Sequence, residues 1–317
     1  MRSAILVVAS LCGASCSSGA TNSDAGGDAA DASVDPSAFV GAFVIALKTD
    51  VQPPVSSMTG QVYDGPTPAM IIWASMATEG DCELLRPRVP FCSTPCGRGA
   101  VCVADETCQR ENAIKDVGRV TVTGVRTTNG TAPFDLVDVN GKYTAVPAPV
   151  FPPFAEGDDV SIAASGASYP AFTLRAKGIS PLVLADGALT AERNKPLTLT
   201  WTPKGASSDA KIHVKLDVSH HGGSKGEISC DTDDDGSLAI SATLVTQLLD
   251  LGVAGFPSIV VTRQASSTSA GPGHVDLRLV HDVERAITVP GLESCTDVTN
   301  STDCAAGKKC QADLTCK

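Results

Sequence analysis

Aromatic residues and positive charge are both scarce in this 317-residue chain. Phe, Trp and Tyr make up 4% of the residues although 43% are hydrophobic, so Val, Leu, Ile and Ala must fill most of the core. The 24 Lys and Arg residues face 35 Asp and Glu residues, which gives a formal net charge of −11 at pH 7. Such an acidic surface repels phosphate backbones and anionic lipid headgroups. We therefore predict that the protein has no nucleic-acid partner. The chain is long enough for two domains.

Long apolar runs are missing too. After a basic start, residues 4–11 are apolar, which suits the core of a signal peptide but is too short to span a bilayer. Residues 11–16 (LCGASC) resemble a bacterial lipobox, with Gly13 at the place where Leu is usual. The sequence thus predicts a lipoprotein signal peptide over residues 1–15 and a lipidated Cys16.

The number of cysteines bears on this choice. If Cys12 leaves with the signal peptide and Cys16 carries lipid, ten of the 12 cysteines remain and all can pair. Simple secretion, with cleavage before Cys16, leaves an odd number and one cysteine without a partner. The parity favours lipidation over simple secretion.

The segment that follows cannot form a core. Residues 17–37 consist almost entirely of Ser, Gly, Ala, Thr, Asn and Asp, so we predict a flexible acidic tether over residues 16–37. In the lipoproteins that this segment resembles, Ser17 after the anchor suits transfer to the outer membrane. We expect a cell-envelope, outer-membrane lipoprotein with the membrane as its partner, on either the periplasmic or the external face.

Two cysteine clusters share one spacing. Residues 96–108 and 304–316 both read C-x2-G-x2-C-x-A-D-x-T-C, and each has one further cysteine upstream, Cys92 and Cys295. Zinc sites favour C-x2-C pairs or histidines at fixed distances, and neither cluster has them. Disulfides are the better interpretation, and they indicate a chain exported from the reducing cytosol.

The pairing within each cluster is a hypothesis, because spacing alone does not fix connectivity. We expect alternating pairing in both clusters, with the two remaining cysteines joined to each other. The expected bridges are Cys92–Cys102, Cys96–Cys108, Cys295–Cys310, Cys304–Cys316 and Cys82–Cys230.

The rest of the chain reads as mainly β. Short apolar stretches alternate with Gly, Pro, Asn and Asp turns, which is typical of sandwiches or barrels, and we favour sandwiches. We predict a β-sandwich domain over residues 38–180, with a cysteine knuckle at 92–108 as a loop excursion. A fibronectin-like β-sandwich domain over residues 181–291 and a C-terminal knuckle over residues 292–317 complete the chain.

The second predicted domain holds the clearest elements. Residues 210–218 (AKIHVKLDV) alternate strictly, so Ile212, Val214, Leu216 and Val218 should face the core while His213, Lys215 and Asp217 face away. Trp201 should anchor that core, and residues 227–230 should return as the next strand. Ser241 can cap one short inserted helix that ends at Gly252.

Two groups in the turn after residue 218 could carry chemistry. Residues 222–226 (GGSKG) match the G-x-S-x-G pattern of serine hydrolases, but Ser224 stands between two strand-like segments and not at a strand-to-helix elbow. A glycine-rich hairpin turn explains the pattern better. His220 and His221 are neighbours in an extended chain, so they should point apart and form a polar hairpin tip and not a metal pair.

The acidic stretch that follows is the one candidate metal site. Asp231, Asp233 and Asp235, followed by Gly236, match the first half of a calcium loop, where alternating oxygens converge on the ion. The twelfth position is Ala242, where a Glu is expected, and a strand precedes the loop. Either a calcium site or an acidic turn is consistent with this pattern; no other cofactor is predicted.

The knuckle spacing, the acidic tether and the lipobox-like segment together resemble cysteine-rich lipoproteins of myxobacteria and their relatives. The run WTP…HVKLD…CDTDDDGS…LVTQLLDLG resembles a β-rich region of such proteins. The resemblance implies an envelope location and a β-rich fold, and it supplies no catalytic residues.

These observations favour a non-enzymatic envelope protein with a structural or recognition role. Its partner would be an envelope or cell-surface protein or a glycan. The alternative is a secreted hydrolase, a calcium-dependent enzyme or a calcium-binding module that uses residues 220–237.

Overall fold

The computed structural model describes residue 35 and residues 37–317 except residue 300, all within one compact unit. The predicted signal peptide, the lipidated Cys16 and nearly all of the predicted tether lie outside the described residues. The described part is mainly β with one helix, which confirms the predicted fold class.

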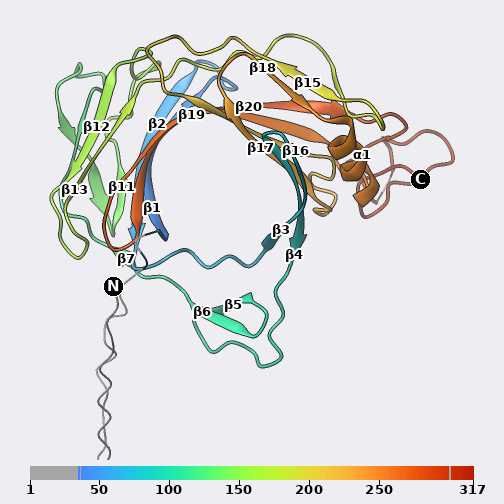
Figure 1. Cartoon of the computed structure of the whole chain (residues 1–317), viewed down its shortest axis with the longest axis horizontal. Helices are drawn as coiled ribbons and strands as arrows, with labels where there is room; N and C mark the ends of the chain where they lie inside the picture. The colour runs from blue at the N-terminus through green and yellow to red at the C-terminus, as the bar shows by residue number, and fades with distance from the viewer. Residues whose placement is uncertain (1–34, 36, 300) are drawn as a thin grey trace, which may run out of the picture. The chain divides into compact units, whose positions relative to one another are not determined.

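A twelve-stranded mixed sheet is the largest element of this unit (Figure 1). Its strands are β1 (Phe39–Lys48), β2 (Val55–Tyr63), β3 (Ile72–Glu79), β4 (Cys82–Arg88), β7 (Ile114–Lys115), β10 (Val137–Val139), β11 (Lys142–Thr144), β14 (Leu189–Thr190), β16 (Lys211–Asp217), β17 (Glu227–Asp233), β19 (Ser258–Thr268) and β20 (His274–Thr288). The main path runs β10-β11-β2-β1-β20-β19-β16-β17-β4-β3, with β7 beside β2 and β14 beside β20.

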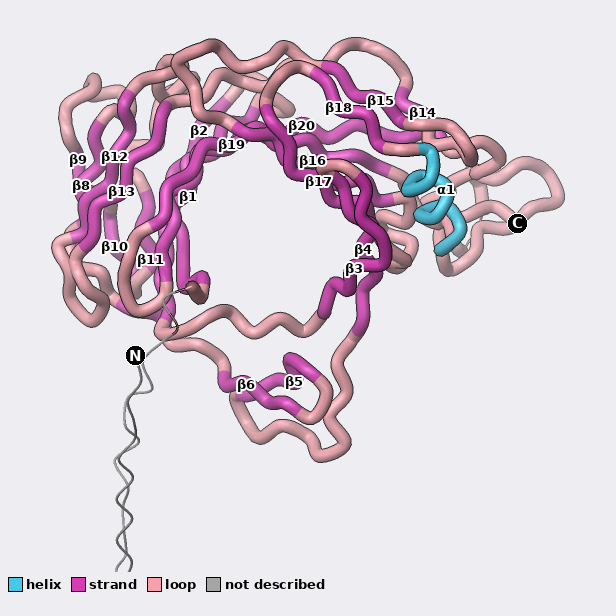
Figure 2. The backbone as a smooth tube through the Cα atoms, in the orientation of Figure 1, coloured by secondary structure: helices cyan, strands magenta, loops and turns pink. Residues whose placement is uncertain are grey.

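The remaining elements are smaller, and all of them except the knuckle pair pack against this sheet. They are β8 (Val120–Thr123), β9 (Phe134–Asp135), β12 (Asp159–Ala164) and β13 (Phe172–Lys177) in one sheet, the pair β15 (Leu197–Thr200) and β18 (Ser237–Ile240), the knuckle pair β5 (Ala100–Ala104) and β6 (Thr107–Arg110), and helix α1 (Ala242–Leu251). In Figures 1 and 2, β12 and β13 lie outside the curve of the long sheet at one end and α1 lies outside it at the other.

The helix and the turn before it follow from local sequence. The Ser241 hydroxyl accepts a hydrogen bond from the Leu244 N–H, and the Gly252 N–H closes the helix onto the Leu249 carbonyl. Four apolar side chains face the core, namely Leu244, Val245, Leu248 and Leu249. The predicted caps are therefore confirmed.

Two hydrophobic cores lie against the long sheet. The first joins Phe43 and Ile45 of β1 to the four-stranded sheet, and the second joins Val214 of β16 to β15, β18 and α1. Ile179 belongs to the first core and Leu182 to the second, but the chain also moves between the cores elsewhere. Leu84 lies in the second core, and Ala265 and Leu277 lie in the first.

Strands from both predicted segments nevertheless pair with each other. β1 runs parallel to β20, and β4 runs antiparallel to β17. One sheet therefore carries both cores. The domain boundaries predicted at residues 180 and 291 remain predictions.

A buried ion pair separates the two cores. Arg263 on β19 and Asp234 after β17 have side chains that are 1% and 0% exposed, and two hydrogen bonds of 2.6 and 3.0 Å join them. Arg263 also donates to the Ser180 hydroxyl and the Thr202 carbonyl, while Asp234 accepts from the Trp201 indole N–H. Because Nε, Nη1 and Nη2 of Arg263 each have an acceptor, the high cost of burying two charges is offset.

A buried histidine continues this polar layer. His281 on β20 lies opposite Arg263 in the register and is fully buried. Its Nδ1 accepts from the Leu182 N–H at 3.0 Å, so the neutral ring carries its proton on Nε2 and donates it to the Thr49 hydroxyl at 3.0 Å. Burial lowers the pKa of His281 below 6.5, and the charge of Arg263 also lowers it while that of Asp282 opposes this shift.

The stability of the protein should therefore depend on pH through His281. The unfolded chain takes up a proton on this ring at about pH 6.5, whereas the folded protein takes it up only at lower pH. The unfolded state binds more protons in that window, so the free energy of unfolding should fall as pH drops below 6.5, by up to about 1.4 kcal/mol per pH unit. Urea unfolding at a series of pH values measures this slope.

His281→Gln should make the free energy of unfolding less dependent on pH between pH 7 and the pKa of His281 in the folded protein. Thr49→Val is the matched control, because it removes a hydrogen bond to the same ring without removing the titrating group. It should lower stability at each pH and keep the slope. Equal slopes in the wild type and His281→Gln would contradict the assignment.

Candidate binding surface

The face of the long sheet opposite the two cores is not covered by another strand or helix among the described residues (Figures 1 and 2). We call it the uncovered face. Alternate side chains along each strand point to it, as Lys211, His213 and Lys215 do on β16. The intervening residues of β16 are buried in the second core, as the sequence predicted.

Opposite charges on β16 and β17 are paired across this face. Lys211 lies directly opposite Asp233 and is bonded to it, and His213 Nδ1 is 2.9 Å from the carboxylate of Asp231. Lys215 reaches diagonally to Glu227 at 3.0 Å. Exposed pairs of this kind each contribute about 1 kcal/mol or less to stability. Their main effect is a rigid pattern of alternating charge.

Polar pairing continues on β19 and β20. The Thr262 hydroxyl donates to Asp282 at 2.6 Å, and the Arg278 guanidinium contacts Asp276 at 2.7 Å. A hollow lies beside Asp282 at the ends of β1, β19 and β20, lined in part by Lys48, Asp50, Val260 and Glu284. The uncovered face thus offers ordered donors and acceptors across several neighbouring strands.

The structure does not bring the three calcium candidates together. Strand β17 runs to Asp233, three residues beyond the predicted end, so Asp231 and Asp233 lie in the strand and each has a basic partner on β16. Only Asp235 lies in the turn, where it accepts the Ser237 N–H at 3.2 Å. Calcium binding stays a prediction from the sequence pattern.

The residue between those candidates is the one that the sequence analysis missed. Asp234 is the buried partner of Arg263, and an acidic run ending in glycine gives no sign of it. Arg263 offered a signal, because it stands at an inward position of a strand whose neighbouring inward residues, Val261 and Ala265, are apolar. An arginine at such a position requires a buried acceptor.

The hydrolase pattern lies in a hairpin turn. Residues 218–226 connect β16 to β17, and Ser224 is exposed. His220 packs against His221 with ring centroids 3.9 Å apart, so the prediction that the two side chains point apart is wrong. The chain is not extended there, because His221 has a φ of 62°. The Nδ1 of His220 is 3.9 Å from Asp217. The hydrogen bonds found among the described residues include none from Ser224 to either histidine. The turn interpretation therefore fits the geometry, and no serine–histidine pair is assembled there.

The structure contains five disulfides. They join Cys82 to Cys230, Cys92 to Cys102, Cys96 to Cys108, Cys295 to Cys310, and Cys304 to Cys316, which are the pairs hypothesised from the sequence. Cysteine groups are the only groups of three or more potential metal ligands close together in the described part of the chain, and their members are in these bridges.

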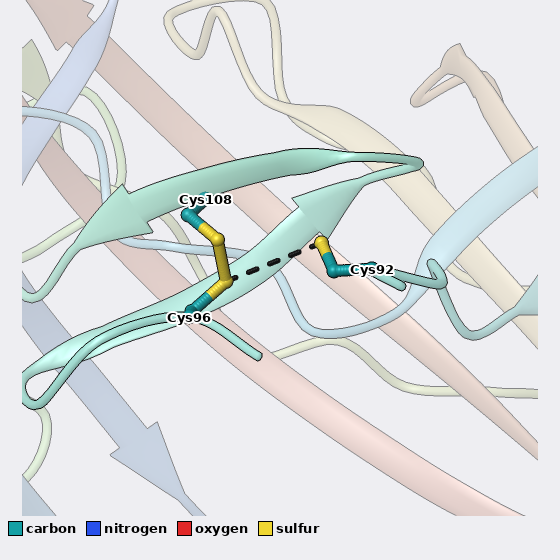
Figure 3. Close-up of side chains that lie close together, drawn as sticks. All are labelled: Cys92, Cys96 and Cys108. Carbon is teal, nitrogen blue, oxygen red and sulfur yellow. Dashed lines mark hydrogen bonds between the residues drawn. A yellow bond between two sulfur atoms is a disulfide. The ribbon is translucent and has the colours of Figure 1, made fainter. Parts of the chain in front are cut away.

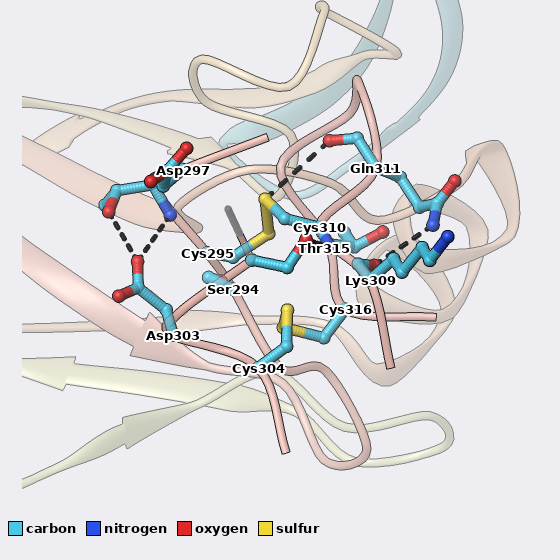
Figure 4. The surroundings of a disulfide bond; sticks show 12 residues. Ser294, Cys295, Asp297, Asp303, Cys304, Lys309, Cys310, Gln311, Thr315 and Cys316 are labelled. Carbon is cyan, nitrogen blue, oxygen red and sulfur yellow. Dashed lines mark hydrogen bonds between the residues drawn. A yellow bond between two sulfur atoms is a disulfide. The ribbon is translucent and has the colours of Figure 1, made fainter. Parts of the chain in front are cut away.

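The two knuckles differ in how they sit on the protein. In the C-terminal knuckle, Cys295 is 1% exposed and is bridged to Cys310 (Figure 4). The Asp313 carbonyl accepts the Gly255 N–H, and the Ser294 hydroxyl donates to the Gly255 carbonyl. The first knuckle contains the hairpin β5–β6, which the sequence analysis had interpreted as a loop. In it, Cys96 and Cys108 form a bridge 4.0 Å from the Cys92 sulfur (Figure 3).

The first knuckle is held by fewer buried contacts. Its four cysteines are half-buried or exposed, and its links to the sheet are mainly polar. Asp105 accepts from Arg88 of β4 at 2.6 Å, and the Gln109 amide donates to the Pro66 carbonyl at 2.6 Å. One knuckle thus docks on the sheet end, while the other projects from it.

Comparisons with known proteins yield structural likenesses only. No protein-family model matches the sequence, and no curated protein matches it. One similar structure is that of the FN1–FN3 domains of chicken CNTN1, at 11% identity and a TM-score of 0.19, covering 72% of this chain and 78% of that one. Another is described as bearing on host cell surface retention of a 1.5-MDa bacterial ice-binding adhesin, at 10% identity and a TM-score of 0.22, covering 70% of this chain and 63% of that one.

A search of the described residues for a membrane-crossing helix finds none with the required length and apolar character.

Proposed function

We propose that this chain is a lipid-anchored envelope protein with a non-enzymatic recognition role, and that it binds its partner through the uncovered face. The observation that carries the proposal is the set of ordered polar pairs on that face, such as the ion pair of Lys211 with Asp233 and the contact of His213 with Asp231. These pairs contribute little to stability. An ordered pattern of polar groups is better suited to recognising a partner with complementary groups.

The backing of this face supports the same proposal. Two cores and the bridge between Cys82 and Cys230 hold the strands in place. Side chains on a rigid sheet lose little entropy on binding, which favours recognition by a preformed surface. A polar face with mixed charge suits a glycan or a polar protein surface as partner.

The cysteines support an envelope location. Five disulfides persist in oxidising compartments and are rare in the cytosol. They occupy all ten cysteines from Cys82 onward, which leaves Cys12 and Cys16. Loss of Cys12 with the signal peptide and lipidation of Cys16 would leave no unpaired thiol, in agreement with the proposed anchor.

Fractionation of cells tests the anchor. The wild-type chain should stay with the membrane fraction and dissolve in detergent, whereas Cys16→Ala should appear in the soluble fraction. Cys12→Ala is the matched control, because it changes the other cysteine near the start of the chain, and it should remain with the membrane. An unchanged distribution for Cys16→Ala would contradict the proposed lipidation.

A binding assay on isolated cell envelopes tests the recognition role. The double variant Lys211→Ala/Lys215→Ala removes two positive charges from the uncovered face and should weaken binding by roughly tenfold, the effect of about 1.4 kcal/mol. Lys177→Ala/Lys195→Ala is the control, because these two exposed lysines also form ion pairs but lie on β13 and after β14. Equal binding by both double variants and the wild type would contradict a role for the uncovered face.

A further inference from the structure

Exposed large apolar side chains gather in one part of the molecule. Six of the fifteen found among the described residues fall between residues 70 and 91, namely Met70, Ile71, Trp73, Met76, Val89 and Phe91. The chain has only two Trp, four Met and eight Phe, so the presence of four of these in one exposed segment is a strong local enrichment. Trp, Phe and Met are the apolar residues most enriched at protein interfaces.

These side chains surround an open sheet edge. Strand β3 ends the twelve-stranded sheet, and among the described strands it pairs only with β4. Native proteins usually protect such an edge with lysine, proline or a very short strand. β3 has eight residues, no lysine and no proline, and its only charged residue is Glu79 at its end. Its one protective feature is a bulge at Met76, where the register with β4 shifts between Ser75 and Ala77. The strand at the opposite end of the sheet, β10, has only three residues.

The charges beside β3 are arranged with opposite signs at its two ends. The register places Arg88 of β4 opposite Ile72 and Arg86 opposite Ala74. Because Arg88 is already paired with Asp105, Arg86 supplies the positive charge near the start of β3. Glu79 stands at the other end. Residues opposite each other in a sheet share a face, and successive residues alternate, so Arg86, Arg88 and Glu79 all lie on one face.

We propose that β3 pairs antiparallel with β3 of a second copy of this chain around a two-fold axis, so that the sheet continues across the dimer. Antiparallel pairing brings the Glu79 end of one strand beside the Arg86 end of the other, on the same face, at both ends of the interface. Glu79 accepts one hydrogen bond within its own chain, from the Ser241 hydroxyl, and Arg86 forms no ion pair among the described residues. A two-fold axis makes such an interface self-complementary. A parallel arrangement would place like charges together.

The apolar side chains complete this interface. Trp73 and Met76 lie on the pairing strand itself, and Val89 and Phe91 follow β4 next to it. Pairing would cover the free backbone groups of β3 and remove these side chains from water, which is favourable in proportion to the area covered. The inference does not depend on the proposed anchor or on a ligand at the uncovered face.

Disulfide trapping in the cells that make the full-length chain tests the dimer. Met76 lies near the middle of β3, close to the axis, so Met76→Cys should form a bridge to its own copy and give a reducible band of twice the chain mass. Val139→Cys on β10 is the matched control, since Val139 is as exposed as Met76 but lies at the other end of the sheet. It should stay monomeric.

Charge reversal in the Met76→Cys background separates specific pairing from collision. Glu79→Arg should reduce the trapped dimer by roughly fivefold, and adding Arg86→Glu should restore it, because the swapped charges again meet across the axis. Arg86 suits the swap because it forms none of the ion pairs found among the described residues. Ser75→Cys, beside Met76, replaces the first variant if that one does not accumulate.

Three outcomes would overturn the proposal. They are the absence of a dimer band for both cysteine variants of β3, equal trapping by Val139→Cys, and a reducible band of another mass, which would show a different protein at this edge. An amount of trapped dimer that is the same with and without the two charge substitutions would also contradict the antiparallel pairing.

Discussion

The buried ion pair between Arg263 and Asp234 is the interaction on which the described structure depends most. Removing two charges from water costs several kcal/mol for each ion, and this pair is tolerable only because hydrogen bonds satisfy both groups. Those bonds reach Ser180 between the two cores, Thr202 after β15 and the indole of Trp201. This pair of side chains therefore holds strand β19, the turn after β17 and the segment around Ser180 together at one point.

This position explains how two cores share one sheet. Along β19, Val261 belongs to the second core and Ala265 to the first, with Arg263 between them. Along β20, Leu279 belongs to the first core and Ile287 to the second, with His281 between them. The polar layer marks the change of core without interrupting the sheet. The opposite face stays continuous, and the proposed recognition role depends on that continuity.

Local patterns in the sequence predicted much of the secondary structure. The alternation of residues 211–216 predicted which side chains of β16 are buried. Asp217, which was expected to face away from the core, is buried too, because the turn after β16 covers it and Ser219 donates to its carboxylate. Ser241 and Gly252 predicted the limits of α1. Trp201 was expected in the core and is there, bonded to Asp234. These features depend on neighbours in sequence, where period and capping chemistry decide the outcome.

Long-range features could not be predicted in the same way. A period of two shows which face of a strand a residue occupies, but not which strands are its neighbours. The expected Cys82–Cys230 bridge linked two segments 148 residues apart, but nothing in the local sequence indicated that β4 pairs with β17 there. Trp73 and Trp201 both occur in strand-like apolar runs, yet Trp73 is on an open edge and Trp201 is buried. Asp234 looked like any residue of an acidic turn until its partner was known.

Calorimetric unfolding of the wild type and of Arg263→Met tests most directly whether the ion pair holds the two cores together as one unit. We predict a single transition with equal calorimetric and van't Hoff enthalpies for the wild type. Arg263→Met leaves the buried Asp234 without its counter-ion, so it should lower the free energy of unfolding of the whole unit by about 3–5 kcal/mol. The exposed Arg285→Met control should change it by about 0.5 kcal/mol or less. Two separate transitions in the wild type, or a variant that shifts only part of the unfolding, would contradict the account.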